Sequence, residues 1–147
     1  LKRVGELSLD YIAMHMKGDP RTMQSLAQYD SVVTDVIEFF KQFEERASRF
    51  GINNYIIDPG FGFSKTISQN YELLAHLDEF STLNREILVG ISRKSMIYKL
   101  LGTSTDDALS ATSALHLYAL NKGASILRVH DVRQAKEVVS LYNALQQ

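Results

Sequence analysis

The residues of this chain that could do chemistry stand where short apolar stretches end. The clearest is Asp58, which directly follows the apolar residues 55–57 and opens the segment DPGFGFSK at 58–65. A carboxylate at the end of a buried strand accepts hydrogen bonds, and the glycines of this segment let a ligand approach the backbone. A phenylalanine stands on each side of Gly62. The segment therefore predicts a pocket for a small ring-shaped molecule.

A basic cluster follows a later apolar stretch. Residues 92–95 read SRKS, and the spacing of apolar residues behind them predicts a short helix. Arg93 and Lys94 would then stand at the amino end of that helix, where positive charge opposes the helix dipole. A bound carboxylate or phosphate explains this arrangement better than a purely structural role does, and the hydroxyl of Ser95 could join in binding it.

A second basic pair follows the last apolar stretch. Arg128 and His130 are two residues apart in a segment predicted to be extended, so their side chains point the same way. Such a pair suits a phosphate or a diphosphate. The alternative is structural, with the pair neutralised by a local acid such as Asp131.

Two further polar residues are given structural or solvated roles. His15 lies between two methionines in an apolar stretch, which favours a buried structural histidine over a ligand. Lys65 is expected to be a solvated charge. A metal site built from His15, Asp58 and His130 is a weak alternative, because the sequence has neither an HxH nor an HExxH pattern.

The spacing of apolar residues also predicts the elements that must position these groups. Either Asp30 or Ser31 is expected to cap the first long helix, and Ser68 the next one. A long loop is expected at 17–30. The predicted strands are residues 11–16, 54–57, 87–91 and 125–129, and the predicted helices are residues 31–50, 68–80, 96–101, 106–121 and 132–145.

Strands that alternate with helices predict an α/β fold with a parallel sheet and right-handed crossovers. Two architectures stay open at this point. One is a small open sheet, and the other is half of an eight-stranded barrel, for which about 250 residues are typical. Ligands bind at the carboxyl ends of the strands in both, which is where the polar groups above are expected.

Composition narrows the function classes. The chain has 147 residues and a formal net charge of -1, so it offers no basic field for nucleic acid or an anionic membrane. It has no cysteine, which excludes disulfides and thiolate metal sites and is compatible with the cytoplasm. No apolar run approaches the roughly 20 residues of a membrane span. Because the chain starts without Met in what could be the tail of a helix, we expect one structural unit, residues 1–147, from a longer protein.

The motifs resemble those of the dihydropteroate synthase family, in the same order and along essentially the whole chain. They are MHMKGDP at 14–20, DPGFGF at 58–63, GISRKS at 90–95 and RVHDV at 128–132. The resemblance implies a (β/α)8 barrel, of which this chain would form strands five to eight, the C-terminal half.

The resemblance also implies a reaction. In this family p-aminobenzoate displaces pyrophosphate from hydroxymethyl-dihydropterin pyrophosphate and gives dihydropteroate, a folate precursor, with assistance from Mg²⁺. The family's N-terminal motifs NVTPDSF and GESTRP are not in this sequence. The chain is therefore expected to be inactive alone, to need the missing N-terminal half, and to leave the magnesium ligand to that half.

For the pterin, the resemblance assigns four residues. Asp58 would accept the adjacent N–H donors of the pterin ring, and Lys94 would donate to ring acceptors on the other side. Arg128 would cover the pterin face. Met14 would line the floor of the pocket.

For the other groups, the resemblance assigns an overlapping set. Phe63, Lys94 and Ser95 would hold the p-aminobenzoate. Arg128 and His130 would bind the leaving pyrophosphate, so Lys94, Arg128 and His130 are the expected catalytic residues.

Two alternatives from other classes remain. A methyltetrahydrofolate methyltransferase-like enzyme would share the pterin-binding acid, but it has no diphosphate to explain both basic clusters. A non-catalytic half-barrel would bind pterin without turnover. The resemblance to the dihydropteroate synthase family also implies a homo-oligomer that forms through helices 106–121 and 132–145.

Overall fold

The computed structural model describes residues 1–18, 21 and 27–146, and strands alternate with helices along them. The strands are β1 (Ile12–Met14), β2 (Ile56–Asp58), β3 (Leu88–Val89) and β4 (Ile126–Leu127). The α-helices are α1 (Lys2–Glu6), α2 (Val32–Ser48), α3 (Ile67–Ala75), α4 (Ser95–Leu101), α5 (Leu109–Asn121) and α6 (Val132–Leu145), and the 3-10 helices are η1 (Leu77–Leu83) and η2 (Asp106–Ala108). The long loop expected at 17–30 lies partly outside the described residues.

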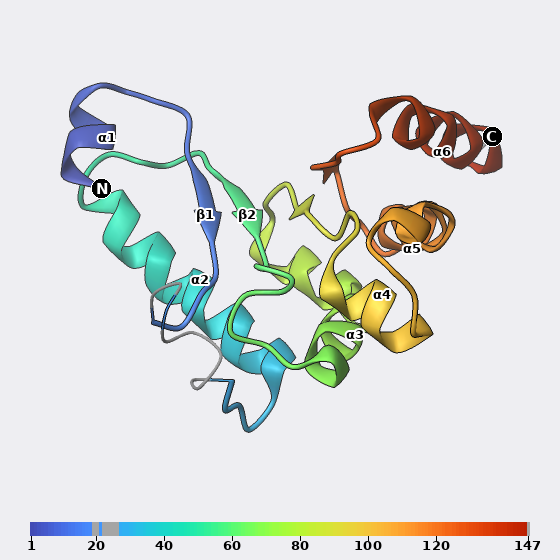
Figure 1. The fold of residues 1–147 in the computed structure, drawn as a ribbon. Helices are drawn as coiled ribbons and strands as arrows, with labels where there is room; N and C mark the ends of the chain where they lie inside the picture. The colour runs from blue at the N-terminus through green and yellow to red at the C-terminus, as the bar shows by residue number, and fades with distance from the viewer. Residues whose placement is uncertain (19–20, 22–26, 147) are drawn as a thin grey trace.

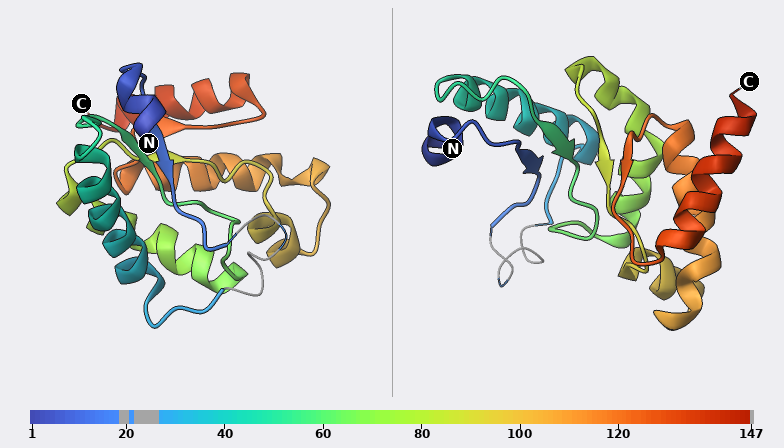
Figure 2. Two further views of the ribbon diagram at one scale, coloured as in Figure 1. Left: turned by 90° about the vertical axis from the view of Figure 1, so that its left-hand side faces the viewer. Right: turned by 90° about the horizontal axis from the view of Figure 1, so that it is seen from above.

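The strands form a parallel arrangement in chain order. β1 pairs with β2, with Met14 opposite Asp58, and β3 pairs with β4. A parallel bridge between Ile57 and Ile87 joins the two pairs. The helices that connect successive strands lie on one side of the strands, as Figures 1 and 2 show. This is expected when right-handed crossovers advance in one direction along the sheet. The predicted parallel α/β fold is confirmed, and the termini lie at opposite ends of an open arc (Figure 1).

The hydrogen-bond ladder holds the first residues after the strands as well. The His15 N–H donates to the Asp58 carbonyl at 2.9 Å, and the Arg128 N–H donates to the Val89 carbonyl at 2.9 Å. The strands themselves are shorter than the apolar stretches that predicted them, because only the central residues of each stretch pair regularly. The backbone pairing therefore fixes the carboxyl ends, where the polar side chains begin.

The core in the first half lies between α2, β2 and η1. Ser31 caps α2, as predicted, by accepting a hydrogen bond from the Thr34 N–H. The α2 residue Phe40 is buried and meets Phe80 of η1 edge to face, with ring centroids 6.3 Å apart. This contact attaches the longest helix to the segment that leads into β3.

Two predicted helices differ from the structure. The N-cap of α3 is Thr66 and not Ser68, because Thr66 and Gln69 form a reciprocal capping box. The helix predicted to reach residue 80 changes to 3-10 geometry after His76. The helix predicted at 106–121 likewise starts as the 3-10 turn η2, and its regular α-helical part begins at Leu109. No helix in the described part of the chain is both long and apolar enough to cross a membrane.

Candidate functional site

The predicted polar residues meet at the carboxyl ends of β3 and β4. A cavity of about 140 Å³ opens there. Its lining residues are Gly90, Ser92, Lys94, Arg128, Val129 and His130. The structure thus brings together Lys94, Arg128 and His130, the three expected catalytic residues.

Asp58 stands beside this cavity as a buried carboxylate with unused capacity. Its Oδ1 accepts a hydrogen bond from the Gly60 N–H at 2.8 Å. Its Oδ2 is buried and has no hydrogen-bond partner among the described residues, although Arg128 Nη2 lies 3.4 Å away. A buried carboxylate oxygen without a donor is unfavourable. The arrangement is therefore suited to a ligand that brings N–H donors to Oδ2.

Gly90 is a site residue that was not predicted from the sequence. A Cβ atom built at Gly90 would lie 2.8 Å from Nη2 and 3.0 Å from Nε of Arg128. The guanidinium can cross the end of β3 only because no side chain is present there. Arg128 is otherwise half exposed, at 54% of its side chain, so its planar fork is open to a ligand.

Lys94 lies between the residues expected to bind the pterin and those expected to bind the p-aminobenzoate. Its Nζ donates to the Phe61 carbonyl and lies 4.7 Å from the centroid of the Phe63 ring. Burial lowers the pKa of Lys94 to about 8, with Asp58 opposing this shift and Arg128 adding to it. Lys94 is thus a partly desolvated cation between the Asp58 carboxylate and the aromatic wall.

His130 is oriented by Ser92. The buried Ser92 Oγ accepts a hydrogen bond from the His130 N–H at 3.2 Å and lies 3.0 Å from His130 Nδ1. In the sequence, Ser92 stands out only as part of a basic segment. No sequence signal marked it as the partner of His130, because the two are brought together by the pairing of β3 with β4.

Arg93 does not belong to the anion site, contrary to the prediction. Its guanidinium makes two hydrogen bonds to Asp131, at 2.8 and 3.0 Å, and donates to the carbonyls of Thr105 and Asp106. Its backbone has a positive φ of 51°, which is uncommon for a residue other than glycine. Asp131 pairs with Arg93 and Arg128 pairs loosely with Asp58, so the structure does not show Asp131 paired with Arg128.

Lys65 is buried, and its prediction as a solvated charge is wrong. It is 4% exposed, and its Nζ lies 3.0 Å from Nδ1 of His15. No local sequence signal marks this burial, because the partner His15 lies 50 residues away in the chain. The structural role favoured for His15 agrees with its buried position and with an edge-on contact to Phe39 at 4.9 Å.

The remaining predicted residues lie around this centre. Phe63 reaches it through Lys94, as described above. Ser95 is the first residue of α4, whose amino end has no side-chain cap among the described residues. Met14 shares the register of Asp58 but lines a separate hollow against α2, so the structure does not bring its side chain into the 140 Å³ cavity.

The described residues contain no group of three His, Cys, Asp or Glu side chains that could hold a metal ion. His15, Asp58 and His130 therefore do not form the metal site that was a weak alternative.

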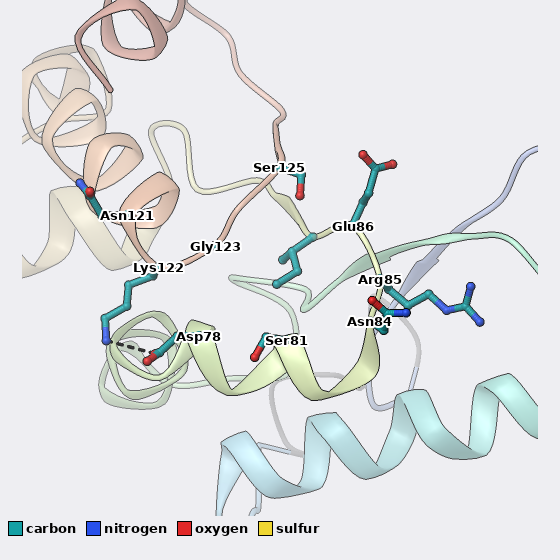
Figure 3. Close-up of a pocket in the computed structure, with 10 residues that line it drawn as sticks. Asp78, Ser81, Asn84, Arg85, Glu86, Asn121, Lys122, Gly123 and Ser125 are labelled. Carbon is teal, nitrogen blue, oxygen red and sulfur yellow. Dashed lines mark hydrogen bonds and ion pairs between the residues drawn. The ribbon is translucent and has the colours of Figure 1, made fainter. Parts of the chain in front are cut away.

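A larger hollow, of about 540 Å³, lies at the opposite end of the strands (Figure 3). Ile87 and Ser125, which precede β3 and β4, are among its lining residues. Two of its charged side chains pair with each other, since Lys122 Nζ lies 3.1 Å from Asp78 Oδ1, as the dashed line shows. Parallel α/β folds bind ligands at the carboxyl ends of their strands, so this hollow is not the candidate site.

Comparison with known proteins identifies a matching family. The family model described as pterin binding enzyme matches residues 1–130. Dihydropteroate synthase of Escherichia coli K12 is 42% identical over 146 residues, which cover 98% of this chain and 52% of that protein. The Haemophilus influenzae enzyme is 40% identical, over 98% of this chain and 53% of its own. The chain therefore spans about half the length of these relatives.

Solved structures agree. Dihydropteroate synthase of Yersinia pestis, solved as a sulfonamide drug complex, superposes with a TM-score of 0.95 at 38% identity, over 99% of this chain and 54% of that one. The Thermus thermophilus enzyme in complex with 4-aminobenzoate gives a TM-score of 0.92 at 38% identity, over 98% and 60% of the two chains. The fold is thus that of half of a dihydropteroate synthase barrel, which decides between the two architectures that the sequence left open.

Proposed function

Since the chain belongs to the family of pterin-binding enzymes, we propose that it supplies the C-terminal half of a dihydropteroate synthase. The proposed reaction joins p-aminobenzoate to hydroxymethyl-dihydropterin and releases pyrophosphate, as a step of folate biosynthesis. The cytoplasm is the proposed location.

One observation supports this function above all: the unpartnered Oδ2 of buried Asp58 beside a cavity lined by Lys94, Arg128 and His130. The amino-pyrimidinone edge of a pterin presents adjacent N–H donors, which a carboxylate can accept in a two-point contact. The cations across the cavity suit the diphosphate of the same substrate. A carboxylate next to cations thus matches a molecule with a donor edge and an anionic tail.

In the proposed reaction, the amine nitrogen of p-aminobenzoate forms a bond to the pterin methylene carbon. The bond from that carbon to the pyrophosphate oxygen breaks, and its electron pair leaves with pyrophosphate while the amine loses a proton. Arg128 and His130 would stabilise the charge that develops on the leaving group, and Lys94 would hold the pterin ring. Phe63 and Ser95 would receive the p-aminobenzoate.

Mg²⁺ is proposed as an assistant in the departure of pyrophosphate. The described residues contain no group of three His, Cys, Asp or Glu side chains that could hold a metal ion. Its ligands would come from the N-terminal half.

We also propose a homo-oligomer that forms through α5 and α6. These helices pack on each other and leave apolar side chains exposed. The exposed apolar residues are Tyr118 of α5 and Val132, Val139, Leu141 and Leu145 of α6. Exposed apolar side chains on two neighbouring helices favour burial against another chain.

Pyrophosphate release from hydroxymethyl-dihydropterin pyrophosphate and p-aminobenzoate, with Mg²⁺, tests the function. We expect no turnover by this chain alone and turnover when an N-terminal half of a dihydropteroate synthase is added. The Asp58→Asn variant should abolish it, because an amide oxygen and NH₂ group cannot accept two N–H donors. Turnover by the chain alone would contradict the claim that the other half is needed.

A non-catalytic half-barrel is the second candidate, because the chain spans only about half of its relatives. Pterin binding without pyrophosphate release in the presence of the N-terminal half would favour it. The methyltransferase alternative predicts instead that there is no pyrophosphate release. It also predicts that changing Arg128 and His130 leaves pterin binding intact.

A further inference from the structure

Lys65 is a buried cation with no role in the proposed reaction. Its Nζ donates to the carbonyls of Gly60 and Phe63, at 3.0 and 3.1 Å, and lies 3.0 Å from Nδ1 of His15. An ammonium group has three N–H donors and can make one hydrogen bond to each of these acceptors. The side chain thus ties two points of the 58–65 loop to the residue that follows β1.

His15 is suited to be an acceptor in this arrangement. Burial, the charge of Lys65 and then the charge of Lys17 lower the pKa of His15 to about 3. The imidazole is therefore neutral near pH 7, and Nδ1 can accept from the ammonium when the ring proton is on Nε2. A fixed contact with Phe39 holds the ring in place, as described above.

The backbones are also pressed together at this point. Gly60 has a φ of 71°, and a Cβ atom built there would lie 1.9 Å from the His15 carbonyl oxygen. Only glycine fits this approach. The backbone after β1 and the loop after β2 therefore lie so close together that the Lys65 side chain can bind both segments.

We propose that Lys65 is a positioning residue that clips the loop after Asp58 onto β1, and so fixes Asp58 and Phe63 relative to each other. The identity of the ligands rests on the proposed function, but the clip does not. Asp58 begins the loop and Phe63 stands near its end, and the ammonium binds carbonyls in both parts. A pterin contact and an aminobenzoate contact would thus be set at a fixed distance before either substrate arrives.

The charge of Lys65 has a second consequence for Asp58. Asp58 is among the groups that raise the pKa of Lys65, so the two charges attract. Arg128 is half exposed and can turn toward a diphosphate, whereas Lys65 is held by its three acceptors. Asp58 would therefore keep one nearby cation when Arg128 moves to the leaving group.

The charge state of Lys65 lies within reach of neutral pH. Burial lowers the pKa of Lys65 to about 7, Asp58 of β2 opposes the shift, and Lys94 and Lys17 add to it. Below that pH the ammonium can satisfy all its acceptors. Above it the neutral amine has only two N–H donors, so the clip weakens as pH rises through about 7.

Amide hydrogen exchange in the 147-residue chain tests the clip without any ligand. In Lys65→Met, the amides of Gly60 and Phe63 should exchange about ten- to a hundredfold faster at pH 6, which corresponds to the loss of a charged hydrogen bond. Amides of α2 should not change. The matched control Lys99→Met, at an exposed position of α4, should leave every rate unchanged. Unchanged exchange at Gly60 and Phe63 in Lys65→Met would overturn the proposal.

If the amides of α2 also exchange faster in Lys65→Met, the variant has not folded. A titration of the unmodified chain then tests the proposal. Titration of ¹⁵N-labelled lysine side chains by NMR should show Lys65 losing its proton near pH 7, far below the ordinary lysine range. His15 should stay neutral down to about pH 4. Titration of Lys65 in the ordinary lysine range would show that the ammonium is solvated and that there is no clip.

Binding of 6-hydroxymethyl-7,8-dihydropterin to the chain plus an N-terminal half separates this proposal from the proposed function. Unmodified protein should bind more weakly as pH rises through about 7, and Lys65→Met should bind about tenfold more weakly at pH 6 without that pH dependence. If exchange responds to Lys65→Met but the unmodified protein binds no pterin, the proposed function fails and the clip stands. If Lys65→Met binds pterin as tightly as the unmodified protein does, at pH 6 and above pH 7 alike, the clip fails.

Discussion

At the scale of single residues, Asp58 and Arg128 form a loose pair at the centre of the site. Their atoms lie 3.4 Å apart, within ion-pair range, but Oδ2 still has no hydrogen bond among the described residues. A loose pair between a buried carboxylate and an exposed guanidinium is easily exchanged for a better donor. The pair can therefore give way to a ligand that brings N–H groups to Oδ2.

Gly90→Ala tests the path of the Arg128 side chain. The added methyl group would meet the guanidinium at under 3 Å, so Arg128 must leave its place over β3 while the backbone stays. We expect pyrophosphate binding by the chain plus an N-terminal half to weaken about tenfold, the scale of one charged hydrogen bond. Isothermal titration with inorganic pyrophosphate measures it.

A double-mutant cycle provides the control for Gly90. In an Arg128→Ala background, Gly90→Ala should cause no further loss, because the residue that it displaces is gone. An equal loss in both backgrounds would mean that Gly90 acts on the backbone and not through Arg128.

The lowered pKa of Lys94 predicts an upper limit to activity. Its ammonium is present below about pH 8 and is lost as pH rises through that value, far below the ordinary lysine range. Turnover that needs this charge should fall about tenfold per pH unit above it. Lys94→Arg, which stays charged, should remove this limb of the pH profile from whatever activity it retains. The rate is measured with the unmodified chain plus an N-terminal half. A rate that stays level to about pH 10, near the ordinary lysine pKa, would contradict the prediction.

At the scale of elements, one ion pair ties the start of α4 to the start of α6. Asp131 is the N-cap position of α6, and Arg93 precedes α4. The Arg93 backbone N–H also donates to Thr112 Oγ1 of α5 at 3.1 Å. The loops after β3 and β4 are thus joined by Arg93, which leaves Lys94 and Arg128 for the cavity.

Asp131→Asn should lower the Tm at pH 7, because the amide cannot replace both charged hydrogen bonds to Arg93. The pairing with Arg93 holds the pKa of Asp131 below its ordinary value. Its contribution is therefore present above the ordinary carboxyl range and lost as pH falls below it, so the Tm difference should shrink at pH 3. Glu137→Gln, which breaks the exposed Arg133 pair of α6, should change the Tm little. Equal effects of the two variants at pH 7 would contradict this.

Phe40 tests the packing of α2. Its ring is buried between Phe39 and Phe80, so Phe40→Ala should lower the free energy of unfolding by about 3–5 kcal/mol, measured by urea denaturation. Phe50, just beyond the end of α2, is 41% exposed and provides the matched control. Phe50→Ala should cost much less, and a similar cost for both would place the core elsewhere.

At the scale of the whole molecule, the arc has two free edges. β1 and β4 each have a strand neighbour on one side within the described residues. Apolar groups remain uncovered near both, including the half-exposed Ile12 and a groove of about 540 Å³ between α6 and the end of β4. Free strand edges and apolar grooves favour pairing with further chain.

An added N-terminal half should cover both edges at once. We expect the two halves to co-sediment in equal amounts in analytical ultracentrifugation, with slower amide exchange in β1 and β4 and unchanged exchange in β2, which is already paired on both sides. Protection at only one edge would mean that the barrel does not close.

The sequence by itself determined the order of strands and helices, the parallel fold and the carboxylates and cations at the strand ends. Local spacing carries this information, since strand and helix periods and helix caps are properties of neighbouring residues. Asp58, Lys94, Arg128 and His130 could be selected because each follows an apolar stretch, and parallel strands bring such positions to one edge.

Only the tertiary structure decided the partners of those groups. That Arg93 turns to Asp131, that Ser92 orients His130 and that Lys65 is buried against His15 all depend on contacts between residues far apart in the chain. The physical reason is that a charge has no preferred partner until the backbone fixes distance and burial. Lys65 shows this most clearly, because the same lysine would be solvated if β1 did not close over its loop.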